Sequence, residues 1–182
     1  MPHNIFPLTE KTEYMTGSYK VAELYARQNH SKTSAVISIH SIINNTNPKI
    51  FCNEKNKIQD VIFFCFEDIR DNNEEHLVYG ISDKDADDIA DFALKWINKV
   101  DLLIIHCDGG ISRSPGVCAG IVKALGGDDS RFFHHYRMSP NIHCYEKTYA
   151  AMKKKLAEIQ KQGGKIPNAN PSSFESFTDK TV

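Results

Sequence analysis

Short apolar runs alternate with segments of helical periodicity along this chain. Three runs of β-branched and other apolar residues, Ala35–Ile39, Val61–Phe66 and Leu102–Ile105, each predict a buried strand. Between and after them, apolar residues recur three and four positions apart, which is typical of amphipathic helices. The sequence predicts helices over Tyr19–Gln28, from Ser82 through Trp96, over Ser114–Leu125 and over Tyr145–Gln160, with a further short helix over Asp129–Arg137. This alternation of strands and helices indicates an α/β layered fold with a mostly parallel sheet.

Loops and chain ends complete the expected organisation. The polar segment 44–57 reads as a loop, and the acidic segment 67–79 as irregular structure. From residue 163 onward the chain is rich in Gly, Pro, Asn and Ser, which is typical of a flexible tail. A length of 182 residues fits one domain with its own core. We therefore expect a single domain over residues 1–162 and a flexible C-terminal tail over 163–182.

Composition and charge are those of a water-soluble protein. Hydrophobic residues make up 41% of the chain, charged residues 25%, and the net charge is −1, so nothing attracts it generally to nucleic acid or to a membrane. No apolar run approaches the ~20 residues that span a bilayer, and the first ten residues lack the basic start and apolar block of a signal peptide. We expect a cytoplasmic monomer that binds neither nucleic acid nor membrane.

The cysteines favour a reducing compartment. They are odd in number, widely spaced and without a Cys-x-x-Cys pair, which argues against a disulfide scaffold or a zinc site. The histidines likewise show no metal-ligand spacing, so we expect no metal. Cys118 reads as a small buried hydrophobe within a helix rather than as a resolving thiol. The five cysteines are Cys52, Cys65, Cys107, Cys118 and Cys144.

The segment 106–114, His-Cys-Asp-Gly-Gly-Ile-Ser-Arg-Ser, follows directly on the third predicted strand. The strand brings Cys107 to the carboxyl edge of the sheet, where ligands of such sheets bind. Gly109 and Gly110 allow the loop to curl, so that successive backbone N–H groups point inward and form an anion site. The N-terminus of the following helix adds positive potential. Arg113 closes this loop with a guanidinium that can bind two phosphate oxygens at once.

This arrangement suits nucleophilic chemistry on a phosphate ester. The positive potential that attracts phosphate also stabilises a thiolate, so Cys107 is expected to attack phosphorus and form a phosphocysteine. Loop amides and Arg113 would stabilise the charge on the transferred group. Ser114 is placed to hydrogen-bond the sulfur as it leaves. His106 is expected to order the loop through its ring nitrogens and to help hold the thiolate charge, without acting as proton donor.

The pattern His-Cys-x5-Arg-Ser, with Gly110 inside it, resembles the signature of the protein tyrosine phosphatases, and in particular their dual-specificity branch. The resemblance extends over roughly residues 34–155. It implies a central, mostly parallel sheet of about five strands flanked by helices. It also implies an aspartic acid on a loop after a strand as general acid. Asp68, just beyond Val61–Phe66, is the first choice and Asp71 the second, while Asn141 resembles the segment that positions water or braces a loop.

The loop side chains suggest the substrate class. We expect the phosphate to contact the loop residues Asp108, Gly109, Gly110, Ile111, Ser112 and Arg113. None of the variable loop positions is basic, and the acidic Asp108 should repel additional phosphates. A monophosphate substrate follows, with phosphotyrosine in a protein or peptide as the first choice. The sequence leaves open whether phosphoserine and phosphothreonine are cleaved as well. No cofactor is required, because the loop supplies the positive field itself.

Two other functions use a similar loop. A phosphate-binding pseudophosphatase module would keep the anion site but lack a working acid. A sulfur-transfer or arsenate-reducing enzyme would need a second thiol within reach or a differently built loop. In the arsenate-reductase arrangement the cysteine also lies near the start of the chain, whereas about a hundred residues precede Cys107 here.

Overall fold

The computed structural model describes residues 5–28, 31–43, 51 and 57–168. Its centre is a five-stranded sheet in the order β1-β2-β5-β3-β4. β1 pairs antiparallel with β2, and all the other neighbours run parallel. The strands are β1 (Ile5–Pro7), β2 (Glu13–Ser18), β3 (Ser34–His40), β4 (Ile58–Cys65) and β5 (Leu102–Cys107). The expected mostly parallel sheet of about five strands is confirmed.

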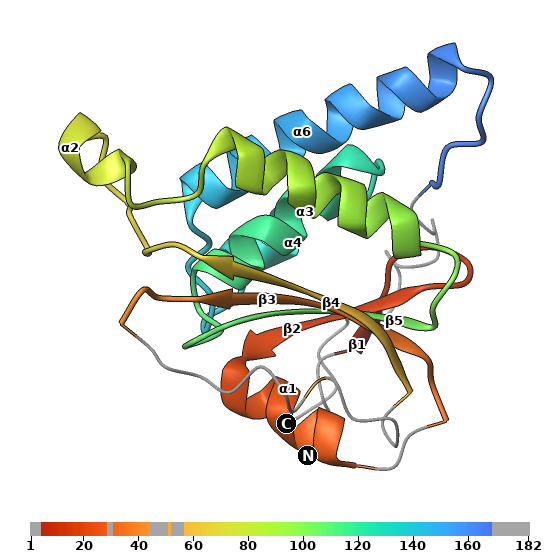
Figure 1. Cartoon of the computed structure of the whole chain (residues 1–182), viewed down its shortest axis with the longest axis horizontal. Coiled ribbons are helices and arrows are strands. Elements are labelled where there is room, and N and C mark those ends of the chain that lie inside the picture. The colour runs from red at the N-terminus through yellow and green to blue at the C-terminus, as the bar shows by residue number, and fades with distance from the viewer. Residues whose placement is uncertain (1–4, 29–30, 44–50, 52–56, 169–182) are drawn as a thin grey trace.

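Helices cover both faces of the sheet, unequally (Figure 1). One face carries α1 (Tyr19–Arg27). The other carries α3 (Asp83–Trp96), α4 (Arg113–Ala124) and α6 (Ile142–Lys161). Two short helices, α2 (Glu74–Leu77) and α5 (Ser130–His134), lie in the connections. The chain is thus layered as the alternating sequence pattern predicts.

Coverage on both faces explains why the central strands are apolar without interruption. Along β5, Leu103, Ile105 and Cys107 join the core beneath α3, α4 and α6, whereas Leu102 and Ile104 join the core beneath α1. Neighbouring side chains of a strand point to opposite faces. Cys107 is therefore held on the α4 side of the sheet at its carboxyl edge.

The structure corrects several element predictions. β1 and β2 were not predicted, because Glu13–Ser18 mixes charged, aromatic and small residues instead of forming an apolar run. β4 is an edge strand, and it is mostly part-exposed rather than buried. The segment 67–79, expected to be irregular, contains α2. The last helix begins three residues earlier than predicted, since Asn141 caps it by accepting from the Cys144 N–H at 3.0 Å.

Two further expectations concern the C-terminal tail and membrane-spanning helices. Residues 169–182 of the predicted tail lie outside the described residues. Of the helices that the structure describes, none combines the length and the apolar character needed to cross a bilayer.

Candidate active site

The carboxyl ends of four parallel strands meet around Cys107. β5 ends at Cys107 itself, and its neighbour β2 ends at Ser18, which pairs with Cys107 in the sheet register. On the other side β3 ends at His40, and Phe66 follows the end of β4. The loop 108–112 lies over this edge and leads into α4. The site is therefore built on rigid strand ends, as the position of the motif predicts.

Cys107 lies at the bottom of this loop and is 2% exposed. The Gly110 N–H donates to Sγ at 3.2 Å, and the Ser114 hydroxyl lies 3.3 Å from Sγ. The Ser114 hydroxyl also lies 3.2 Å from the Gly17 carbonyl. Donors aimed at a sulfur stabilise its thiolate, as does the nearby N-terminus of α4.

Gly110 is the residue that lets the loop curl. It has a φ of +70°, which favours glycine. A Cβ at this position would lie 2.2 Å from the Ser18 nitrogen and 2.3 Å from the Gly17 carbonyl carbon. No side chain fits there, so the loop backbone packs directly on the end of β2.

Arg113 is the first residue of α4, and its guanidinium is buried under the loop. One terminal nitrogen donates to the Phe66 carbonyl at 2.7 Å, and the other to Asp108 Oδ2 at 2.7 Å. A guanidinium has five N–H donors. These two contacts fix the plane of the group and leave further donors for phosphate oxygens.

Asp108 has a different environment from the one expected. Its Oδ2 accepts from Arg113 and from the Ser41 N–H and hydroxyl at 2.9 and 2.8 Å, and His40 Nδ1 lies 3.6 Å from Oδ1. The carboxylate is thus paired with the Arg113 cation and with two donors from Ser41. Its negative charge is largely compensated by Arg113, so Asp108 is not expected to repel additional phosphates.

Asp68 lies across from the loop, on the segment that follows β4. Its Oδ1 accepts from the Ser112 hydroxyl at 2.6 Å and from the Asn141 side-chain amide at 2.8 Å. The Asn141 amide also donates to the Ile69 carbonyl at 2.7 Å. The side chain of Asp68 is 37% exposed. With Oδ1 held by two donors, Oδ2 is the oxygen that can exchange a proton with a bound substrate.

Asp71, the second choice for general acid, is directed elsewhere. Its carboxylate lies 3.0 Å from His76 Nδ1 and accepts from the Asn73 N–H at 3.0 Å. These hydrogen bonds, His76 first, hold its pKa below the ordinary value. A lowered pKa favours the ionised form, which cannot donate a proton. Of the two candidates, only Asp68 contacts the loop 108–112 in the described part of the chain, through Ser112.

His106 does not have the role expected from the sequence. Its ring is buried, and neither nitrogen has a hydrogen-bond partner among the described residues. It packs against Tyr19, His40 and Phe51 at centroid distances of 5.6, 5.5 and 5.2 Å. Burial lowers its pKa to about 3. A neutral ring carries no positive charge to offset a thiolate, and neither ring nitrogen donates to Sγ, so the residue contributes packing beneath the loop.

The other thiols are poor nucleophiles or lie elsewhere. Burial raises the pKa of Cys118, as expected for a small residue within the core, and also that of Cys144. Cys65 is exposed on β4, and Cys52 lies outside the described residues. Within the described part of the chain, no group of three or more His, Cys, Asp and Glu residues gathers in a metal-binding arrangement.

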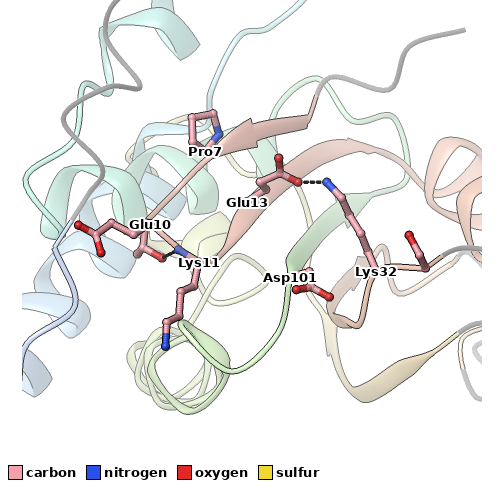
Figure 2. Close-up of a pocket in the computed structure, with 8 residues that line it drawn as sticks. Pro7, Glu10, Lys11, Glu13, Lys32 and Asp101 are labelled. Atoms are coloured by element: carbon pink, nitrogen blue, oxygen red, sulfur yellow. Dashed lines mark hydrogen bonds and ion pairs between the residues drawn. The ribbon is translucent and has the colours of Figure 1, made fainter.

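A polar cavity of about 520 Å³ lies at the opposite edge of the sheet (Figure 2). Glu13 and Asp101, which line it, stand at the amino-terminal ends of β2 and β5. Within it Lys32 pairs with Glu13. The cavity shares no residue with the surroundings of Cys107, so it does not belong to the candidate site.

Comparison with solved structures places this geometry in a known architecture. Tk-PTP in its active form superimposes with a TM-score of 0.54 at 12% identity, over 85% of this chain and 99% of that one. PTPMT1 gives 0.53 at 15% identity, over 86% and 99%. PTPMT1 in complex with PI(5)P gives 0.54 at 15% identity, over 82% and 95%. The chain has the fold of the protein tyrosine phosphatases. No family model and no curated protein matches its sequence.

In this phosphatase fold the structure gathers most of the predicted site residues. Cys107, Arg113, Ser114, Asp68 and Asn141 lie around one loop, together with the backbone of residues 108–112. Ile111 is 54% exposed beside it. Sequence reasoning did not identify Arg70 and Ser41, both of which contact the loop or its residues. Ser41 contacts Asp108, 67 positions away, and Arg70 contacts Ser112, 42 positions away, so only the folded structure reveals these two residues.

Proposed function

We propose that this protein is a cysteine-dependent phosphatase that hydrolyses phosphate monoesters through a phosphocysteine at Cys107. The observation that carries the proposal is the pair of donors on Sγ, from Gly110 and Ser114, at the base of a loop closed by Arg113. A sulfur held in this way is both stabilised as a thiolate and positioned beneath an oxyanion site.

The reaction takes place in two displacements. The Cys107 thiolate attacks phosphorus, the bond to the ester oxygen breaks, and Asp68 gives its proton to the departing oxygen. In the second step a water attacks the phosphocysteine and Asp68 accepts a proton from that water. The S–P bond then breaks and returns the electron pair to sulfur, where the Ser114 hydroxyl stabilises the thiolate. Arg113 and the loop amides hold the phosphoryl oxygens throughout.

The proposed substrate is phosphotyrosine in a protein or peptide, with phosphoserine and phosphothreonine as further esters to be compared. Ile111 offers an exposed apolar side chain beside the loop, and no loop residue between Cys107 and Arg113 is basic. Both features favour a substrate with one phosphate on an apolar group. Because a structure of PTPMT1 contains PI(5)P, phosphoinositides belong in the same substrate panel.

Cleavage of an aryl phosphate by wild type and by Cys107→Ser and Asp68→Asn variants tests the proposal. We expect no detectable turnover for Cys107→Ser, and a decrease in kcat of about 10²- to 10⁴-fold for Asp68→Asn. Binding of inorganic tungstate to each variant, measured by calorimetry, shows whether the loop remains intact. Retained turnover in Cys107→Ser would contradict the proposal.

The same measurements address a pseudophosphatase module. Such a protein would bind tungstate and yet show no turnover even as wild type. The hydrogen bonds that orient Asp68 against the loop argue for turnover, because a module that only binds phosphate has no need of an oriented acid.

A further inference from the structure

Arg70 joins three segments that surround the candidate site. It lies two residues after Asp68, and its guanidinium donates to the Ser112 hydroxyl oxygen from Nε at 3.2 Å and from a terminal nitrogen at 2.9 Å. The other terminal nitrogen donates to the Ser139 hydroxyl at 3.1 Å, and the terminal nitrogen that contacts Ser112 also donates to the Ser139 carbonyl. The acid segment is thereby tied to both the phosphate loop and the turn before α6.

The two donors on Ser112 decide where its proton points. A serine hydroxyl has one proton to donate and two lone pairs to accept with. Arg70 directs two N–H donors at the hydroxyl oxygen, so the hydroxyl proton points away from the guanidinium and is donated to Asp68 Oδ1, which lies 2.6 Å away. In turn Oδ1 is occupied by Ser112 and Asn141, and Oδ2 is presented to the site.

Electrostatics alone does not explain these contacts. The Arg70 Nε is 3.8 Å from Asp68 Oδ2, beyond hydrogen-bond distance, and both side chains are more than a third exposed. A solvated ion pair at this separation contributes little. The forked hydrogen bonds to Ser112 are the specific feature of Arg70, and a lysine could not reproduce them, because it lacks the planar fork.

We infer that Arg70 is a positioning residue for the general acid: it fixes the Ser112 hydroxyl, and through it the Asp68 carboxyl, in the orientation that protonates the leaving oxygen. This inference rests on the proposed function. Loss of this positioning should slow some esters more than others, because protonation of the leaving oxygen matters most for an ester of a weakly acidic phenol. For an ester with a strongly acidic phenol, departure needs little assistance.

Kinetics on two esters test the inference. For Arg70→Ala and Arg70→Lys, we expect kcat with phenyl phosphate to fall by about 10- to 100-fold, the scale of a small misplacement in a site. With a fluorinated coumarin phosphate, kcat should stay near the wild-type value. The double variant Asp68→Asn/Arg70→Ala should be no slower than Asp68→Asn, because both substitutions remove the same effect, the protonation of the leaving oxygen. Arg137→Ala, at an exposed arginine beside Tyr136, is the matched control and should behave as wild type.

Three outcomes overturn the inference: equal losses on both esters, multiplicative losses in the double variant, or full activity in Arg70→Lys. If the wild-type protein binds tungstate but cleaves neither ester, the proposed function fails separately. Amide hydrogen exchange then tests the positioning directly. Arg70→Ala should accelerate exchange over residues 67–73 relative to Arg137→Ala, and unchanged exchange there would contradict the role assigned to Arg70.

Discussion

The Asp108 carboxylate and the Arg113 guanidinium form the central charge pair of the site. They meet at 2.7 Å with 19% and 6% of their side chains exposed. Ser41 adds two donors to the same carboxylate oxygen. A buried charge is tolerated when a partner and hydrogen bonds satisfy it. Asp108 therefore acts on phosphate indirectly, through the orientation of Arg113.

The variant Asp108→Asn separates this role from simple repulsion. An amide keeps the shape but loses the charge-assisted hydrogen bond to Arg113, which is about twice as strong as a neutral one. We predict that tungstate, measured by calorimetry, binds about tenfold more weakly, equivalent to about 1.4 kcal/mol. Ser41→Ala, which keeps the Arg113 contact, should have a smaller effect. Tighter binding of tungstate by Asp108→Asn would show that the carboxylate mainly repels anions.

At the scale of elements, the close packing of α4 against α6 brings Asn141 to Asp68. Gly116 of α4 faces the first turn of α6, and a Cβ there would lie 2.5 Å from the Asn141 carbonyl oxygen and 3.0 Å from Cys144 Cβ. The absence of a side chain at Gly116 thus permits the α6 N-terminus to reach the site. The sequence alone shows a glycine within a helix but not the neighbour that requires it.

Replacement of Gly116 by alanine should therefore affect both stability and catalysis. We predict a loss of about 1–3 kcal/mol in the free energy of unfolding, typical of overpacking. We also predict a lower kcat with phenyl phosphate, because Asn141 moves away from Asp68. Urea unfolding and steady-state kinetics measure the two effects. The control is Gly80→Ala, whose Cβ would meet Ile69 at an ordinary 3.4 Å; equal behaviour of the two variants would disprove the packing argument.

The outer faces of α3 and α6 are joined by ion pairs. Lys147, Lys154 and Lys155 of α6 lie 2.7–3.1 Å from three aspartates of α3, namely Asp83, Asp87 and Asp91. Lys154 and Lys155 therefore lie on the polar side of α6 that faces the aspartates of α3. Such exposed pairs contribute little individually, so removing any one of them should change the free energy of unfolding only slightly.

At the scale of the whole molecule, buried histidines make stability depend on pH. Burial lowers the pKa of His106 from 6.5 to about 3 and also lowers the pKa of His40. Below about pH 6.5 these histidines bind protons in the unfolded chain but stay neutral in the folded chain. The free energy of unfolding should therefore fall as the pH decreases from about 6.5 toward 3.

For His106 alone the decrease between about pH 7 and pH 5 should be about 2 kcal/mol. Urea unfolding of wild type and His106→Asn at the two pH values measures this decrease. The free energy of unfolding of the variant should decrease by about 2 kcal/mol less than that of wild type. His134→Asn, at an exposed histidine, should keep the wild-type slope. Parallel slopes for wild type and His106→Asn would contradict the assigned burial effect.

Much of this architecture can be predicted from the sequence, and the features that cannot be predicted have physical reasons. The apolar runs of β3 and β5, the motif 106–114 and Ser82, whose hydroxyl caps α3 by accepting from the Asp85 N–H at 3.0 Å, are local signals. The sheet centre, α3 and the loop 108–112 were therefore predictable. β1 and β2 lack such a signal: β2 is stabilised by pairing with β5, and β1 by pairing with β2. In the site, Cys107 and Arg113 follow from spacing. The partners of Asp108, the contacts of Arg70 and the burial of His106 depend on residues distant in sequence and required the structure.

The central claim is a covalent bond between Cys107 and phosphorus during turnover. Mixing the protein with an aryl phosphate, quenching in acid within the first turnover and mapping peptides by mass spectrometry tests it most directly. The account predicts one phosphoryl group on the peptide that contains Cys107, and none in Cys107→Ser. Turnover without this adduct, or with phosphate on another residue, would contradict it.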